Sequence, residues 1–160
     1  MFNFLKKKVT REVLGSPAKG KIISLSKVKD KMFANKMLGD GIAFILEKDI
    51  LKAPCDGEVS MIAATKHAFG ITSSLGAEIL IHVGLDTVNL NGEGFEFLVD
   101  AHQKVVAGQP ILKIDRAFMK SQGIDLTTPM IITNGDSLKM EISQEEKVVD
   151  YEEPLITITK

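Results

Sequence analysis

The sequence predicts an all-β fold, namely a single-domain antiparallel β-sandwich or barrel with Greek-key or jelly-roll-like connections and two short helical turns. Short apolar runs recur along the 160 residues, and most are bounded by Gly, Pro, Asn or Asp. The 13 glycines against 5 prolines suit short strands joined by tight turns. This length fits one domain with a sizeable core that needs no disulfide or metal.

Two weak internal repeats indicate that the domain has two related halves. The first aligns Pro17-x-x-Gly20-x-Ile22 with Pro54-x-x-Gly57-x-Val59. The second aligns Lys104-Val105-Val106 and Pro110-Ile111-Leu112 with Lys147-Val148-Val149 and Pro154-Leu155-Ile156. Each repeat reads as a short strand entered through a turn, so the halves are expected to share a strand arrangement.

The elements are expected in the following order. Residues 1–13 form a flexible N-terminal tail, and a single domain occupies 14–160. Two helical turns are expected, one within 28–36 and one over 116–122 that Asp115 caps and Gly123 ends. The strands are expected over 19–26, 42–46, 57–63, 66–72, 79–83, 87–90, 95–98, 103–106, 110–114, 128–133, 148–149 and 155–158.

Composition excludes several classes of protein. The 20 basic and 21 acidic residues leave a net charge of −1, so no global basic surface favours nucleic acid. No apolar run approaches the roughly 18 residues needed to span a membrane. The start, MFNFLKKKVTREV, places its charges after a very short apolar stretch, the reverse of a secretory signal. The single cysteine, Cys55, excludes an internal disulfide, suits a reducing compartment and is expected to be a small structural residue.

The stretch from Thr65 to Val88 predicts a β-hairpin that carries two histidines, His67 and His82. The turn is expected at Ser73–Gly76, centred between Ser74 and Leu75. Opposed residues of such an antiparallel pair have numbers that sum to 149, which places His67 opposite His82 on one face. A shift of one residue would place the two rings on opposite faces.

Two adjacent imidazoles suit phosphoryl transfer. A neutral ring can attack as a nucleophile, and a neighbouring N–H can donate to the transferred group. Thr65 is expected to share the face of His67 and to hold its tautomer, and Asp86 to reach back to a ring or backbone donor. Gly84 is expected to leave space beside His82 for a ligand or partner. A histidine pair is also half of a tetrahedral zinc site, so the residues alone leave both chemistries open.

Several motifs along the chain are specific to one family. The segments are Gly76–Val88, Thr65–Phe69, Asn91–Phe95, Gly39–Gly41, Ala53–Gly57 and Thr128–Ile132. Together they resemble the glucose-type enzyme IIA of the bacterial phosphoenolpyruvate-dependent sugar phosphotransferase system. The resemblance runs from about Gly15 to Lys160, and its order along the chain is that of the family.

The resemblance implies an antiparallel β-sandwich and a phosphotransferase with a covalent phosphohistidine. It implies that His82 accepts the phosphoryl group through Nε2, that His67 stabilises it, that Thr65 orients His67, and that Asp86 belongs to the same site. Phospho-HPr would be the donor and a cysteine of a sugar-specific IIB domain the acceptor. No cofactor is implied. The location would be the cytoplasm, with transient contact at the inner membrane face through the permease.

Two other functions stay open from the sequence. The same histidine face suits a regulatory binding module, although Ala63, Ala64 and Ile81 replace aromatic residues that family members often carry there. A zinc hydrolase would need a third protein ligand near the histidines, for which Asp86 is the candidate. Zinc held by His67 and His82 is otherwise expected only as an adventitious or partner-dependent ion. Phe33 is expected either at the docking surface or in ordinary core packing.

Overall fold

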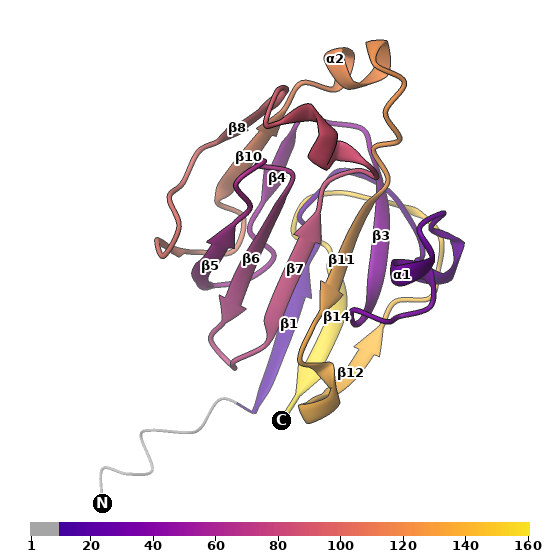
Figure 1. Cartoon of the computed structure of the whole chain (residues 1–160). Coiled ribbons are helices and arrows are strands. Elements are labelled where there is room, and N and C mark those ends of the chain that lie inside the picture. The colour runs from indigo at the N-terminus through magenta and orange to yellow at the C-terminus, as the bar shows by residue number, and fades with distance from the viewer. Residues whose placement is uncertain (1–9) are drawn as a thin grey trace, which may run out of the picture.

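The computed structural model describes residues 10–160, which fold as a β-sandwich of three antiparallel sheets (Figure 1). The predicted all-β class is confirmed. Of the two alternatives, the sandwich is correct, because within the described residues each sheet has two edge strands and none closes on itself. No helix in this part of the chain is long and apolar enough to cross a membrane.

Residues 10–160 contain short strands, two α-helices and three 3₁₀ turns. The helices are α1 (Lys31–Ala34) and α2 (Arg116–Ser121), and the turns are η2 (Leu25–Lys27), η3 (Thr87–Leu90) and η4 (Gly135–Ser137). The strands are β1 (Arg11–Gly15), β2 (Gly20–Ser24), β3 (Asp40–Leu46), β4 (Ile50–Lys52), β5 (Gly57–Ile62), β6 (Ala68–Ser73), β7 (Glu78–His82), β8 (Phe95–Phe97), β9 (Lys104–Val105), β10 (Pro110–Ile114), β11 (Thr128–Ile132), β12 (Lys139–Ile142), β13 (Val148–Val149) and β14 (Pro154–Thr159).

The largest sheet has eight strands in the order β13-β2-β3-β11-β7-β6-β5-β9. Its halves mirror each other in connectivity, since β13-β2-β3-β11 corresponds to β9-β5-β6-β7. Gly20 pairs with Leu46 and Val149 in one half, as Gly57 pairs with Ser73 and Val105 in the other. The two halves expected from the repeats are therefore present.

The register of the second repeat differs from the expected alignment by one residue. Lys104 and Val105 correspond to Val148 and Val149, since each pair occupies the same positions beside β5 and β2. The expected alignment placed Lys104 with Lys147. The chance match of two Lys-Val-Val triplets misled the alignment, and the equal spacing to Pro110 and Pro154 is the correct guide.

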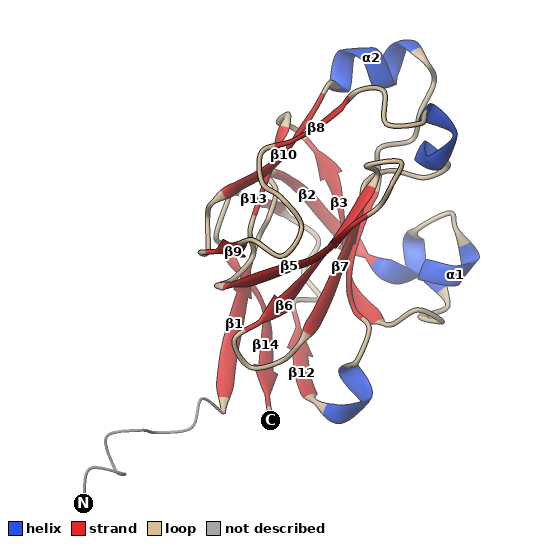
Figure 2. Cartoon of the chain, turned by 60° about the vertical axis from the view of Figure 1, so that its left-hand side comes forward, coloured by secondary structure: helices blue, strands red, loops and turns tan. Residues whose placement is uncertain are grey.

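Two hydrophobic clusters cover the two faces of the large sheet. The main core fills the sandwich and includes Phe44, Phe69, Ile81 and Met130, all nearly or fully inaccessible. A smaller cluster lies on the outer face, where segment 25–38 packs its apolar side chains against the sheet. Its buried members are Leu25, Val28, Phe33, Ala43, Leu85 and Ile131. Figure 2 shows α1 outside the sheet on the side of β3. We call residues 25–38 the cover segment.

Several boundary predictions are wrong. Arg11–Val13 belong to β1, which pairs with β14 from Arg11 opposite Thr159, so this part of the predicted tail is ordered strand. Residues 1–9 lie outside the described residues. Thr87–Leu90 is a 3₁₀ turn rather than a strand, because Asp86 and Asn91 on either side adopt left-handed conformations. Strands β1, β4 and β12 were not expected, since their charged and short sequences lack a clear apolar pattern.

Other local predictions are confirmed. Helix α2 begins where expected, and the Asp115 side chain accepts a hydrogen bond from the Phe118 amide at 3.0 Å. A short helix also forms within residues 28–36 as α1. Cys55 is buried in the main core, and this burial raises the pKa of its thiol to about 12. The cysteine is therefore an unreactive structural residue.

Candidate functional site

The hairpin of β6 and β7 pairs with a register one residue away from the predicted one. Ala68, not His67, lies opposite His82, and the paired numbers sum to 150. Thr72 pairs with Glu78, and the Ser73 amide donates to the Ala77 carbonyl. The turn therefore has a three-residue loop ending at Gly76, whose φ of 94° favours glycine, instead of the expected two-residue turn.

The two imidazole rings are neighbours despite this change of register. His67 lies outside β6, in the turn that precedes it, so the alternation of side chains along a strand does not apply to it. Lys66 adopts a left-handed conformation (φ 60°), and the Val83 amide donates to the His67 carbonyl at 2.7 Å. The ring centroids of His67 and His82 are 4.9 Å apart and nearly perpendicular, at 78°.

Hydrogen bonds at Nδ1 orient both rings. His82 Nδ1 lies 2.8 Å from the Gly84 carbonyl oxygen, which can only accept, so Nδ1 carries the proton. In the neutral ring this leaves the lone pair on Nε2. His67 Nδ1 lies 2.6 Å from Thr65 Oγ1. The expected Thr65–His67 contact is therefore present, although a turn and not a strand brings the two residues together.

Both rings favour the neutral state at neutral pH. Burial lowers the pKa of His82, and the Gly84 carbonyl and the Asp30 charge oppose this without reversing it. Burial also lowers the pKa of His67, and the charge that His82 would carry adds to the effect. The pair thus supplies a nucleophilic nitrogen on His82 with a second imidazole beside it.

The cover segment contributes two residues to the surroundings of His82. The Phe33 ring lies 5.1 Å from the His82 ring, centroid to centroid, and tilts by 56°. Phe33 is buried in the small outer cluster, so of its two expected roles core packing is confirmed, and its ring also lies beside His82. Asp30 was not predicted as a site residue. It caps α1 by accepting from the Met32 amide at 2.9 Å, and an aspartate before an apolar turn was its signal in the sequence.

Comparisons with known proteins agree with this geometry. The family described as the phosphoenolpyruvate-dependent sugar phosphotransferase system, EIIA 1, matches residues 12–138. The chain belongs to this EIIA family. A solved structure of the glucose permease IIA from Mycoplasma capricolum is 35% identical, covers 96% of this chain and 97% of that one, and superposes with a TM-score of 0.84. A structure of Helicobacter pylori Csd3 reaches only a TM-score of 0.39 at 10% identity, over 89% of this chain and 34% of that one, and supports no inference.

Family membership assigns this EIIA a phosphocarrier role in sugar transport by the phosphotransferase system. The β-sandwich expected from the resemblance is the fold observed. Within residues 10–160, no group of three or more His, Cys, Asp or Glu side chains is arranged to hold a metal ion. His67 and His82 would therefore need a ligand from elsewhere to bind zinc.

Two expectations about residues that follow β7, Gly84 and Asp86, differ from the structure. Gly84 does not leave open space, because a Cβ there would lie 2.7 Å from Thr87 Cγ2 and 3.0 Å from the Asp125 carbonyl oxygen. Its φ of 75° also favours glycine. The buried Thr87 hydroxyl donates to the Val83 carbonyl at 2.6 Å and is thus engaged within the fold. Asp86 is exposed, and its carboxylate makes no hydrogen bond with either ring in the described contacts.

Proposed function

We propose that this EIIA accepts a phosphoryl group from phospho-HPr on Nε2 of His82 and passes it to a cysteine of a IIB domain. The observation that carries the proposal is the hydrogen bond from His82 Nδ1 to the Gly84 carbonyl, which leaves Nε2 with the lone pair beside the His67 ring. Since a IIB domain serves a membrane permease, the chain would act in the cytoplasm and contact the inner membrane face through that permease.

Each transfer is a displacement at phosphorus. The lone pair of His82 Nε2 forms an N–P bond while the N–P bond of the donor's phosphohistidine breaks, and the donor ring regains its lone pair. In the second step a thiolate of the IIB cysteine attacks phosphorus, and His82 leaves as a neutral imidazole. The proton stays on Nδ1, hydrogen-bonded to the Gly84 carbonyl, through both steps, so neither step needs a base on this chain.

His67 is proposed to stabilise the transferred group. If the Thr65 hydroxyl donates to Nδ1, the neutral His67 ring carries its proton on Nε2 and presents a donor to the phosphoryl oxygens. Thr65 would then fix the tautomer as well as the orientation of the ring. The lowered pKa of His67 is compatible with a neutral donor at pH 7.

The flanking residues are proposed to form the docking surface for both partners. Two exposed apolar side chains belong to this surface. Met32 lies on α1, the helix that carries Phe33, and Val88 lies on η3, the turn that follows β7. Asp30 and Asp86 add carboxylates there, which favour a partner that presents cationic groups around its phosphoryl group. A small patch of this kind suits partners that bind briefly.

A phosphorylation assay with enzyme I, HPr and labelled phosphoenolpyruvate tests the proposal. The native chain is expected to take up an acid-labile, base-stable label, and His82→Ala none. His67→Ala is expected to accept some label and to pass it on poorly. If phospho-HPr forms while the native chain takes no label, or if His82→Ala is labelled like the native chain, the proposal is wrong.

A further inference from the structure

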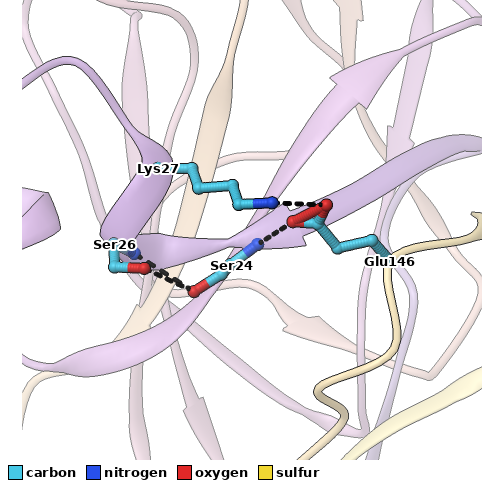
Figure 3. Close-up of polar contacts among 4 residues, drawn as sticks. All are labelled: Ser24, Ser26, Lys27 and Glu146. Carbon is cyan, nitrogen blue, oxygen red and sulfur yellow. Dashed lines mark hydrogen bonds and ion pairs between the residues drawn. The ribbon is translucent and has the colours of Figure 1, made fainter.

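A cluster of polar contacts lies where β2 ends and the cover segment begins (Figure 3). Glu146, in the chain between β12 and β13, accepts from the Lys27 ammonium at 2.8 Å and from the Ser24 amide at 3.3 Å. The Ser24 and Ser26 hydroxyls lie 2.8 Å apart. These contacts tie residues separated by 119 and 122 positions in the sequence.

At the end of β2, the Glu146 carboxylate accepts the hydrogen bond of the Ser24 amide in place of a backbone carbonyl. The register of β13 with β2 pairs Lys21 with Val148, and the Ile22 amide donates to the Lys147 carbonyl. Continuing this ladder would bring the Ser24 amide to the backbone of Glu145. The Glu146 side chain accepts from the Ser24 amide instead, at the point where the chain leaves β2 to form the cover segment.

The position of the cover segment in turn determines the surroundings of His82. The Phe33 ring lies 5.1 Å from the His82 ring, centroid to centroid, and the Asp30 charge raises the pKa of His82. Leu25, directly after Ser24, and Val28, three residues further on, anchor the same segment to the sheet through the small outer cluster. A displacement at Ser24 therefore passes through these short, packed residues to Asp30 and Phe33.

We infer that Glu146 is a positioning residue for the phosphoryl-transfer site: by fixing Ser24 and Lys27 it holds the cover segment so that Phe33 packs against His82. The inference rests on the proposed role of His82. Glu146 touches no reacting atom, so its loss weakens the placement of the site and the docking surface without removing the nucleophile.

Three variants test this role. Glu146→Ala removes both contacts, whereas Glu146→Gln keeps an acceptor for the Ser24 amide and removes the ion pair. Glu153→Ala is the matched control, because it breaks the similarly exposed Lys147–Glu153 pair (3.1 Å) and leaves the cover segment untouched. The readouts are the pH titration of the His82 ring by NMR and the KM and kcat for phospho-HPr.

Glu146→Ala is expected to move the His82 titration upward toward its ordinary range, since the loosened cover segment buries the ring less and burial outweighs the Asp30 charge. KM for phospho-HPr is expected to rise roughly two- to fivefold, as for the loss of an exposed contact, with a smaller change in kcat. Glu146→Gln is expected to fall between Glu146→Ala and the native chain, and Glu153→Ala to match the native chain.

The inference is overturned if Glu146→Ala titrates like the native chain, whatever happens to KM, or if Glu153→Ala shifts equally. If Glu146→Ala does not fold, Glu146→Gln decides by the same criterion. A failure of the proposed function is distinguishable, because it would leave the native chain unlabelled while the His82 titration, which needs no phosphoryl donor, still reports the effect of Glu146.

Discussion

The two halves of the large sheet share one strand arrangement and differ in what they carry. In one half Gly41 pairs with Ile131, and in the other Ala68 pairs with His82. Ile131 is therefore the equivalent of His82, and Gly41 is the equivalent of Ala68. Asp40 correspondingly occupies the place of His67. The connection between β2 and β3 is the long cover segment, whereas β5 and β6 are joined by the short turn 63–67.

This difference shows how a symmetric scaffold supports a single site. The short turn leaves the histidines partly open to a partner, and the long connection of the other half buries Ile131 and reaches over to His82. One half therefore carries the two histidines of the proposed site, and the other supplies Phe33, which packs beside His82. The following variants contrast equivalent positions in the two halves.

The largest effect is expected from the pair His67→Ala and Asp40→Asn. His67→Ala should slow transfer from phosphorylated His82 to the IIB domain by about 10²–10³-fold, the usual cost of losing one donor to a developing charge. Asp40→Asn, at the equivalent position, keeps the acceptor for the Gly41 amide. It loses only the exposed ion pair with Lys36 (3.5 Å), which follows Phe33 in the chain, and should leave the rate unchanged. Single-turnover transfer measures both rates. Equal rates in the two variants would contradict the assignment of roles to the halves.

Next in size is the loss of stability in Gly41→Ala. The new Cβ would overlap the Met130 carbonyl oxygen and approach Ile131 Cα, whereas the equivalent Ala68 carries a Cβ without difficulty. We expect a loss of about 3 kcal/mol in the free energy of unfolding, measured in urea. Gly135→Ala is the control, because its Cβ would meet only the flexible end of Met140, and it should cost less than about 1 kcal/mol. Similar midpoints for the two variants would refute this explanation.

A smaller effect is expected in the pH dependence of stability. Both histidines have a lowered pKa in the folded state, and an ordinary value near 6.5 applies when the chain unfolds. Below that pH the unfolded state binds more protons than the folded state. The stabilisation that comes from keeping the two rings neutral is therefore complete above about pH 7 and is lost as the pH falls through the lowered pKa values of the folded state. The urea midpoint of the native chain should fall from pH 7.5 to 5.5 more steeply than that of the double variant His67→Gln/His82→Gln. Parallel curves would count against the burial of the rings as the cause.

The smallest effect is expected from Asp30→Asn. The Asp30 charge raises the pKa of His82, so its removal should lower that pKa further, while asparagine still caps α1. NMR titration of the His82 ring measures the shift, and Asp40→Asn in the other half should produce none. An upward shift in Asp30→Asn would mean that the substitution displaces the cover segment instead of acting through charge.

The sequence by itself determined the class of the fold and the pair of histidines on which the proposed chemistry depends. Apolar runs between turn residues predicted a β-sandwich or barrel, and the two Pro-x-x-Gly repeats predicted its halves, because both signals depend on short-range patterns. The family resemblance implied the sandwich. The Thr65–His67 contact and the Asp115 cap were predictable for the same reason, since each joins residues two or three apart. The Gly76–Val88 motif pointed to the family that the comparisons then showed.

Only the tertiary structure decided the register and the environment of the histidines. The three-residue loop shifts the strand pairing by one residue, so His67 is not opposite His82. The turn at Lys66, which has a left-handed conformation, nevertheless brings the two rings together. The placement of Phe33 at His82 and the bonds of Glu146 to Ser24 and Lys27 join distant parts of the chain. Such contacts result from the packing of whole elements on a sheet, and a local pattern of residues does not specify them.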